Sequence, residues 1–191
     1  MDRAEMERIF KQTGLMLEGH FLLTSGRHSN RYMQCAKLFQ YPEYSEMICK
    51  DLAGRFAGQR IDLVVGPALG GIIMSYEMAR QCKVPNIFAE RENGVMTLRR
   101  GFSIREGAKV LVVEDVVTTG GSVREVMDIV AEAKAEVVGV CVVVDRSGGK
   151  IDFGVPFEAA YETEIQSYEP SQCPLCEQGL ELVKPGSRKL K

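Results

Sequence analysis

One continuous segment, residues 110–122, constrains the fold of this chain more than any other. It reads Val-Leu-Val-Val-Glu-Asp-Val-Val-Thr-Thr-Gly-Gly-Ser: an aliphatic run, two adjacent acids, a turn of small residues, and the start of a helical pattern. The aliphatic run predicts a buried strand over 109–114 that ends at Glu114 and Asp115. Because ligands of open α/β sheets bind at the carboxyl ends of strands, the segment predicts an α/β fold with a site at this edge.

The turn after the two acids suits a phosphate group. Its small residues leave backbone N–H groups accessible, and the following helix adds the positive end of its dipole. Carboxylates do not bind phosphate, but they accept hydrogen bonds from vicinal hydroxyls. A ribose 5-phosphate satisfies both halves of the segment. Its expected contacts are Glu114, Asp115, Val116, Val117, Thr118, Thr119, Gly120, Gly121 and Ser122.

Three other interpretations of this segment are possible. An ATP-type P-loop requires a lysine in the turn, and this turn has none. A dinucleotide-binding loop requires Gly-x-Gly-x-x-Gly, which the pair Gly120-Gly121 does not supply. An ordinary buried strand followed by a capped helix would need only Ser122 or Thr119 as the cap. Two adjacent acids at a strand end are costly unless they are solvated or functional, which favours a binding site.

These thirteen residues resemble the ribose-phosphate signature of the type I phosphoribosyltransferases. That family transfers ribose 5-phosphate from 5-phosphoribosyl 1-diphosphate (PRPP) to a nitrogenous acceptor. The resemblance extends from about residue 14 to 162 and implies a mostly parallel central sheet flanked by helices, with a small N-terminal hood. It also implies Mg²⁺ carried by PRPP, and a homodimer in which a lid of one subunit serves the neighbouring site.

The chain organisation agrees with one domain over residues 1–191. With 45% hydrophobic residues, a chain of this length can bury a full core. We expect a hood over about 1–40, a core over about 41–162, and an irregular tail over about 166–191. Periodicity predicts helices over 2–13, from Pro42 to Gly58, over 70–82, and from near Val123. It predicts the remaining strands over 61–65, 85–89, 137–145 and 157–161.

A second strand-to-helix turn and a polar connection could complete the PRPP site. The turn Gly66-Pro67-Ala68-Leu69-Gly70-Gly71 is small enough for backbone amides to approach an anion, and the resemblance implies that Leu69 and Gly70 hold diphosphate. Some orotate-specific relatives carry a lysine where Gly70 stands. The alternative is that this segment is a tight turn without a binding role.

The polar connection over residues 90–107 is the candidate lid. Its arginines would stabilise the departing diphosphate, so Arg99 and Arg100 join Glu114 and Asp115 as candidate catalytic residues, and Arg91 is expected to bind PRPP. Arginine is not an acid at neutral pH, so proton transfer is not assigned to it. A solvated surface loop is the alternative.

The acceptor is predicted from two further places in the sequence. Arg146 follows the strand 137–145, where a guanidinium could hold a planar carboxylate with two hydrogen bonds. The segment from Gly19 to Tyr32 contains Phe-x-Leu-x-Ser-Gly-Arg and resembles the hood of orotate phosphoribosyltransferases. The resemblance therefore implies orotate as acceptor, with Thr118, Arg146 and Tyr32 as its contacts. A salt bridge from Arg146 to surface acids is the alternative.

The cysteines and histidines give a weaker signal. Cys173-Pro174-Leu175-Cys176 has the spacing of half a tetrahedral zinc site, and the other half is missing from the sequence pattern unless a second chain supplies it. A redox pair and plain packing are the alternatives. His20 and His28 are expected to be hydrogen-bonded hood residues rather than metal ligands.

The resemblance to the orotate phosphoribosyltransferases therefore implies a pentosyltransferase of UMP biosynthesis that forms orotidine 5′-monophosphate and diphosphate. A purine-base phosphoribosyltransferase and a PRPP-sensing regulator are the alternatives. A formal net charge of −2 does not favour a nucleic-acid surface, and no apolar run approaches a membrane span, so we expect a cytoplasmic enzyme with small-molecule substrates.

Overall fold

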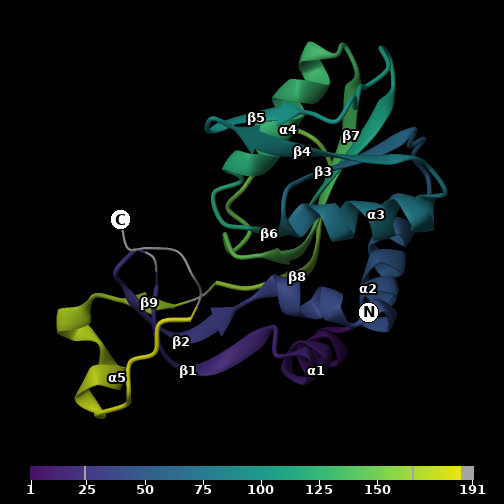
Figure 1. The fold of residues 1–191 in the computed structure, drawn as a ribbon. Helices are drawn as coiled ribbons and strands as arrows, with labels where there is room; N and C mark the ends of the chain where they lie inside the picture. Colours follow the sequence, from purple (N-terminus) through teal and green to yellow (C-terminus); the bar gives the residue numbers. More distant parts are fainter. Residues whose placement is uncertain (24, 165, 186–191) are drawn as a thin grey trace.

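A six-stranded sheet forms the centre of the molecule in the computed structural model, which describes residues 1–23, 25–164 and 166–185 (Figure 1). Its strand order is β5-β4-β3-β6-β7-β8, and all neighbours are parallel except the edge pair β4–β5. The strands are β3 (Leu63–Pro67), β4 (Asn86–Glu92), β5 (Val95–Leu98), β6 (Lys109–Val117), β7 (Glu136–Asp145) and β8 (Phe157–Glu162). The predicted α/β class with a mostly parallel sheet is confirmed.

The central strand β6 is buried on both faces because its side chains alternate between two cores. Leu111 and Val113 pack into the core that includes residues of α2 (Pro42–Arg55) and α3 (Gly70–Cys82). Val110 and Val112 pack into the other core, which includes α4 (Gly121–Glu132). A continuous aliphatic run is what a strand covered by helices on both sides requires. The predicted helix 70–82 has these same bounds in the structure.

The first helix shows how local chemistry sets its ends. In α1 (Arg3–Thr13), the Asp2 side chain accepts a hydrogen bond from the Glu5 backbone N–H at 2.8 Å, and Gly14 closes the helix with φ +68°. These are a standard N-cap and a left-handed C-cap. The short 3₁₀ helix η1 (Cys35–Gln40) then leads into α2.

A second, three-stranded sheet carries the N-terminal hairpin and part of the tail. Its order is β1-β2-β9, with β1 (Met16–Leu22), β2 (His28–Met33) and β9 (Ser167–Tyr168). We call β1 and β2 the hood. The prediction of an irregular tail was wrong over its described part: β9 pairs with β2, and the short helices η2 (Pro170–Gln172) and α5 (Pro174–Glu177) follow. Residues 186–191 of that prediction lie outside the described residues. Figure 1 shows hood and tail projecting to one side of the large sheet.

The prediction of a polar connection over 90–107 was also wrong in its first half. β4 runs on to Glu92, and β5 pairs with it antiparallel, so this part is a hairpin. Asn93 and Gly94 form its two-residue turn, both with positive φ (53° and 86°). Asn-Gly is a strong signal for such a turn because both residues tolerate the left-handed region. In the part of the chain that the structure describes, no helix is long and apolar enough to cross a membrane.

Candidate active site

The turn between β6 and α4 forms a pocket. Glu114 and all residues from 116 to 123 line it, and the side chains of Thr118 and Thr119 are exposed there. Gly120 has φ +76°, and a Cβ at this position would lie 2.9 Å from a ring carbon of Phe153. Only glycine fits both the backbone angle and the space. The turn therefore presents backbone and hydroxyl groups at the start of a helix, which is suited to binding an anion.

Glu114 and Asp115 lie beside this pocket, within β6 rather than after it, because the strand extends to Val117. The Asp115 backbone N–H donates to Glu114 Oε1 at 3.1 Å. Burial, and then the neighbouring Asp115 carboxylate, raise the pKa of Glu114. Burial also raises the pKa of Asp115. Two half-buried carboxyl groups held together in this way are strong acceptors for sugar hydroxyls.

The β3–α3 turn packs directly against both acids. A Cβ on Gly70 would lie 2.2 Å from Asp115 Oδ2, and one on Gly71 would lie 3.4 Å from Glu114 Oε1. The two anion-binding turns predicted from the sequence therefore lie at one site. With the Asp115 carboxylate in this place, a side chain at position 70 would force that carboxylate to move. Leu69, by contrast, is 83% exposed.

Arg146 lies at the same sheet edge, directly after β7. Its backbone N–H donates to the carbonyl oxygen of Val117 at 2.9 Å, which places it next to the end of β6. The side-chain Nε is buried and has no hydrogen-bond partner among the described residues. Burial lowers the pKa of Arg146, with Cys35 and Tyr32 acting in the opposite direction. A buried guanidinium nitrogen without a partner is costly, and an anionic ligand would satisfy it.

The hood approaches this edge through Tyr32. Its ring is half-buried and lies 5.9 Å from that of Phe21, centroid to centroid, and its hydroxyl donates to Gln34 Oε1 at 3.2 Å. Tyr32 is also one of the groups that act on Arg146 electrostatically. The buried Cys35 was not singled out in the sequence. Burial and the Asp115 charge raise the pKa of its thiol, so it lies behind the acids as a neutral group.

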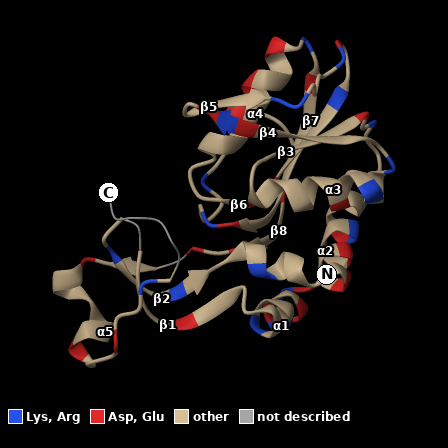
Figure 2. Cartoon of the chain, viewed as in Figure 1, with Lys and Arg blue, Asp and Glu red and all other residues tan. Residues whose placement is uncertain are grey.

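The three lid arginines are paired with carboxylates outside the phosphate turn. Arg91 pairs with Glu125 of α4, Arg99 with Glu92 at 3.2 Å, and Arg100 with Glu90 at 3.1 Å. Figure 2 shows that basic and acidic residues are mixed along the chain near β5 and α4. Aromatic packing anchors the following segment, since the rings of Phe88 and Phe102 lie 5.2 Å apart. Any contact of these arginines with diphosphate requires them to leave the present pairs.

Cys173 and Cys176 are not near the sugar-phosphate pocket. They lie in the tail against the hood, and their sulfur atoms are within 4.8 Å of ring nitrogens of His20 and His28. His20 Nε2 and His28 Nδ1 are 2.9 Å apart. The sequence predicts hydrogen-bonded histidines rather than metal ligands, and this arrangement beside two cysteine sulfurs is compatible with both. The sequence pattern did not indicate that the same chain brings all four residues together.

Comparison with known proteins identifies the family. Residues 43–153 match the family model described as a phosphoribosyl transferase domain. The chain is 62% identical over 190 residues to an orotate phosphoribosyltransferase of Pelotomaculum thermopropionicum, with 100% of both chains covered. It is 59% identical over 189 residues to one of Caldicellulosiruptor bescii, covering 99% of this chain and 100% of the relative.

A solved structure gives the same result for the fold. The crystal structure of orotate phosphoribosyltransferase from Aeropyrum pernix superposes with a TM-score of 0.70 at 26% identity, covering 83% of this chain and 94% of that one. The resemblance found in the sequence is therefore confirmed along the full chain. This protein belongs to the phosphoribosyltransferase family, among the orotate phosphoribosyltransferases.

Proposed function

We propose that this chain transfers ribose 5-phosphate from PRPP to orotate, giving orotidine 5′-monophosphate and diphosphate in a cytosolic step of UMP biosynthesis. The assignment of orotate as the acceptor rests on Arg146, which lies at the same sheet edge as the phosphate turn. Its buried Nε has no hydrogen-bond partner among the described residues. The orotate carboxylate has the planar geometry that a guanidinium binds with two hydrogen bonds. The full-length similarity to orotate enzymes supports this assignment.

Each part of the site has a role in this reaction. The turn from Thr118 to Ser122 would hold the 5-phosphate, and Glu114 and Asp115 would accept hydrogen bonds from the ribose hydroxyls. The β3–α3 turn, with Leu69 and Gly70, would receive the diphosphate. Orotate would lie between Arg146, Thr118 and Tyr32. These groups fix the sugar C1 and the acceptor nitrogen in line, so positioning supplies much of the rate enhancement.

Charge stabilisation supplies the rest. Departure of diphosphate leaves positive charge on the sugar, and the two carboxyl groups beside the ribose are placed to stabilise it. On the leaving side, Arg99 and Arg100 would exchange their Glu92 and Glu90 partners for diphosphate as the lid closes and excludes water. Arg91 would bind PRPP in the same way.

The proposal includes magnesium carried by the diphosphate and ribose hydroxyls of PRPP. The oxygen donors of Glu114 and Asp115 fit this hard cation, which prefers carboxylate and phosphate oxygens and retains waters. When bound, magnesium neutralises charge on the departing diphosphate. Few protein ligands are needed for this.

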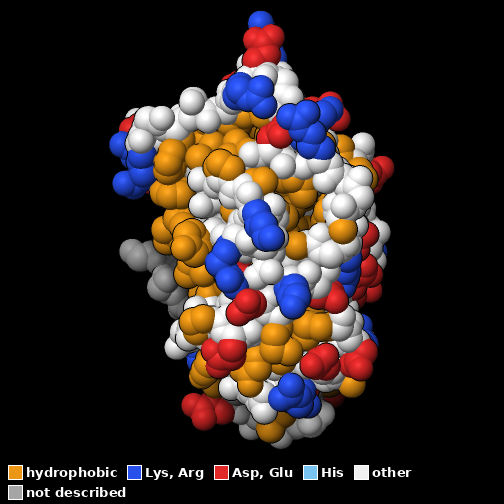
Figure 3. Space-filling model, turned by 90° about the vertical axis from the view of Figure 1, so that its right-hand side faces the viewer, with side chains coloured by type: hydrophobic (Ala, Val, Ile, Leu, Met, Phe, Trp, Pro, Cys, Tyr) orange, Lys and Arg blue, Asp and Glu red, His pale blue; other side chains and the backbone are white. Residues whose placement is uncertain are grey.

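We further propose a homodimer with a shared lid. Large apolar side chains are exposed at the start of α3 and on its outer face: Leu69, just before the helix, is 83% exposed, Ile73 50% and Tyr76 63%. Next to it lies an apolar groove lined by Ile72, Ile73, Tyr76, Asn86, Phe88 and Phe102. Figure 3 shows hydrophobic side chains exposed between charged ones on the side where α2 and the end of α3 lie. An exposed apolar patch of this kind, next to Phe102 of the lid segment, is suited to contact with a second copy of the chain.

The acceptor is tested by the loss of orotate absorbance with PRPP and magnesium, beside hypoxanthine, guanine, adenine and xanthine as parallel substrates. Consumption of orotate alone supports the proposal. If a purine is consumed and orotate is not, the chain is a purine transferase; PRPP binding without turnover of any base would instead favour a regulator.

The shared lid is tested by mixing two inactive variants, Arg100→Ala and Asp115→Asn, under conditions that exchange subunits. If one subunit's lid serves its neighbour, a hybrid dimer contains one intact site, and random mixing restores about a quarter of wild-type activity. If each lid serves its own subunit, the mixture has only the mean activity of its two parents.

A further inference from the structure

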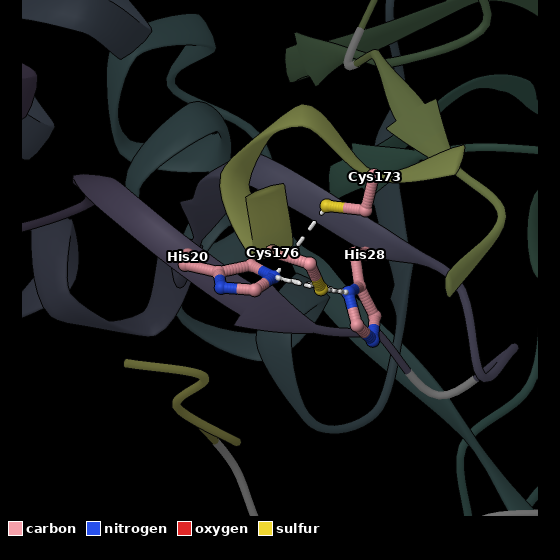
Figure 4. Close-up of side chains that lie close together, drawn as sticks. All are labelled: His20, His28, Cys173 and Cys176. Atoms are coloured by element: carbon pink, nitrogen blue, oxygen red, sulfur yellow. Dashed lines mark hydrogen bonds between the residues drawn. The ribbon is translucent and has the colours of Figure 1, made fainter. Parts of the chain in front are cut away.

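The hood and the tail bring together four side chains that the proposed reaction does not use. His20 of β1, His28 of β2, and Cys173 and Cys176 at the start of α5 point toward one another (Figure 4). Three of them are almost fully buried, with exposed fractions of 3% for His20, 6% for His28 and 1% for Cys173. We propose that these four residues bind one structural zinc ion that fastens the tail to the hood.

The four ligand atoms lie within 4.8 Å of one another, and the distances from nitrogen to sulfur are close to those of a tetrahedral site. With Zn–N of about 2.0 Å and Zn–S of about 2.3 Å, a tetrahedron has edges of about 3.3 Å between nitrogens and about 3.5 Å between nitrogen and sulfur. Here His20 Nε2 lies 3.6 Å from Cys173 Sγ and 3.7 Å from Cys176 Sγ, and His28 Nδ1 lies 3.3 Å from Cys176 Sγ. The two ring nitrogens are 2.9 Å apart, so this edge must lengthen by about 0.4 Å when the ion binds.

The other ring nitrogen of His20 identifies the tautomer. His20 Nδ1 lies 2.8 Å from the carbonyl oxygen of Leu180. A carbonyl oxygen can only accept, so Nδ1 carries the proton and Nε2 has its lone pair directed at the cluster. A ligating histidine that donates its second N–H to a backbone carbonyl is the usual outer arrangement of a zinc site. This contact also comes from the tail.

The donor set favours zinc and a structural role. Two thiolates and two neutral imidazoles balance the charge of a divalent ion, so the buried site is neutral when filled. Cys-x-x-Cys with two histidines is a closed four-ligand set that leaves no position for substrate. Soft sulfur ligands in this number do not suit the magnesium of the proposed reaction.

The surrounding backbone shows what the ion would hold. Outside the cluster, β9 pairs with β2 over two residues, and the backbone of Val183 bonds to His20 and Leu22 at 2.9 Å each. Ser29 Oγ donates to the Gln166 carbonyl oxygen at 2.8 Å, and Arg27 forms an ion pair with Glu169. Arg27 also donates to Ser167 Oγ at 2.8 Å. A strand of two residues gives little stability by itself. A zinc ion would join both hood strands and α5 in one unit.

The test uses full-length, untagged protein and zinc alone as the probe. We expect about one zinc per chain by elemental mass spectrometry, both as purified and after removal and return of the metal. Cobalt(II) in its place should give the intense visible bands of a tetrahedral ion and a near-ultraviolet thiolate-to-cobalt band. This readout is independent of transferase activity.

Variants assign the ligands. Cys173→Ser with Cys176→Ser should lower zinc occupancy at least tenfold and abolish the thiolate band, whereas the matched control Cys82→Ser, on α3, should retain both. Wild-type protein that takes up no zinc and gives no tetrahedral cobalt spectrum overturns the proposal, even if the double variant fails to fold. A Cys173–Cys176 disulfide in protein purified without oxidant, or equal zinc loss in Cys82→Ser, overturns it as well.

Discussion

Replacing Arg146 by alanine should separate orotate binding from PRPP binding. The side chain would make two charge-assisted hydrogen bonds to the orotate carboxylate, each contributing about 1.5–3 kcal/mol. Allowing for solvent at this half-buried position, we expect a loss of about 3–5 kcal/mol, which corresponds to a hundred- to several-thousand-fold rise in the orotate KM. The PRPP KM should change less than about threefold, because the phosphate turn and the acids are untouched.

The same substitution should leave the stability of the free enzyme unchanged or slightly higher. Because Arg146 Nε is buried without a partner, its removal leaves no new unpaired group in the free enzyme. The melting temperature without substrates should therefore not fall. Steady-state kinetics by orotate absorbance and a thermal melt measure both effects, with Arg124→Ala as the control, since that exposed arginine bonds to the Asp152 carbonyl instead. An equal rise in the KM values for orotate and for PRPP would refute the assigned role.

Three further predictions follow from the site and the tail. Gly70→Ala should lower kcat/KM for PRPP at least tenfold, because its Cβ would displace the Asp115 carboxylate; Gly54→Ala, with open space around it, should have no such effect, and similar values for both would contradict the contact. Folding raises the pKa of Glu114, which means that the folded protein favours the protonated carboxyl group. The stability gained from this protonation is fully present below the ordinary glutamate pKa of about 4.3 and is lost as the pH rises through the pKa of the folded state. Glu114→Gln should therefore melt above wild type at alkaline pH, with no such gain near pH 4 and with reduced turnover; a variant that melts lower at alkaline pH would rule this out. Removing zinc by a chelator should lower the melting temperature and speed amide exchange in the tail, with recovery on zinc addition, whereas melts that are identical with and without chelator would speak against a structural ion.

The sheet and its main site were predictable because their signals are local. The aliphatic run of β6, the acids and the small turn are contiguous, and alternating burial against helices on both faces follows from one strand. The hairpin β4–β5 was missed although Asn93-Gly94 signals it, because the last residues of β4 before the turn, residues 90–92, are all charged.

The remaining features depend on contacts between distant segments. The space that excludes a side chain at Gly70 is occupied by Asp115, 45 positions later, and no pattern around either residue reports it. His20 and Cys173 are separated by 153 positions, so Cys-x-x-Cys looked like half a site. Pairing of the tail with β2 brings the other half to it. Composition and periodicity do not encode such proximity.

The most direct measurement of the central claim is a competition among acceptors. Limiting PRPP and magnesium are given to the enzyme with equal concentrations of orotate, hypoxanthine, guanine, adenine and xanthine, and the nucleotide products are identified by mass spectrometry. The account predicts orotidine 5′-monophosphate as the dominant product, lost in Arg146→Ala. A purine nucleotide as the main product, or orotidine 5′-monophosphate formed equally well by Arg146→Ala, would contradict it.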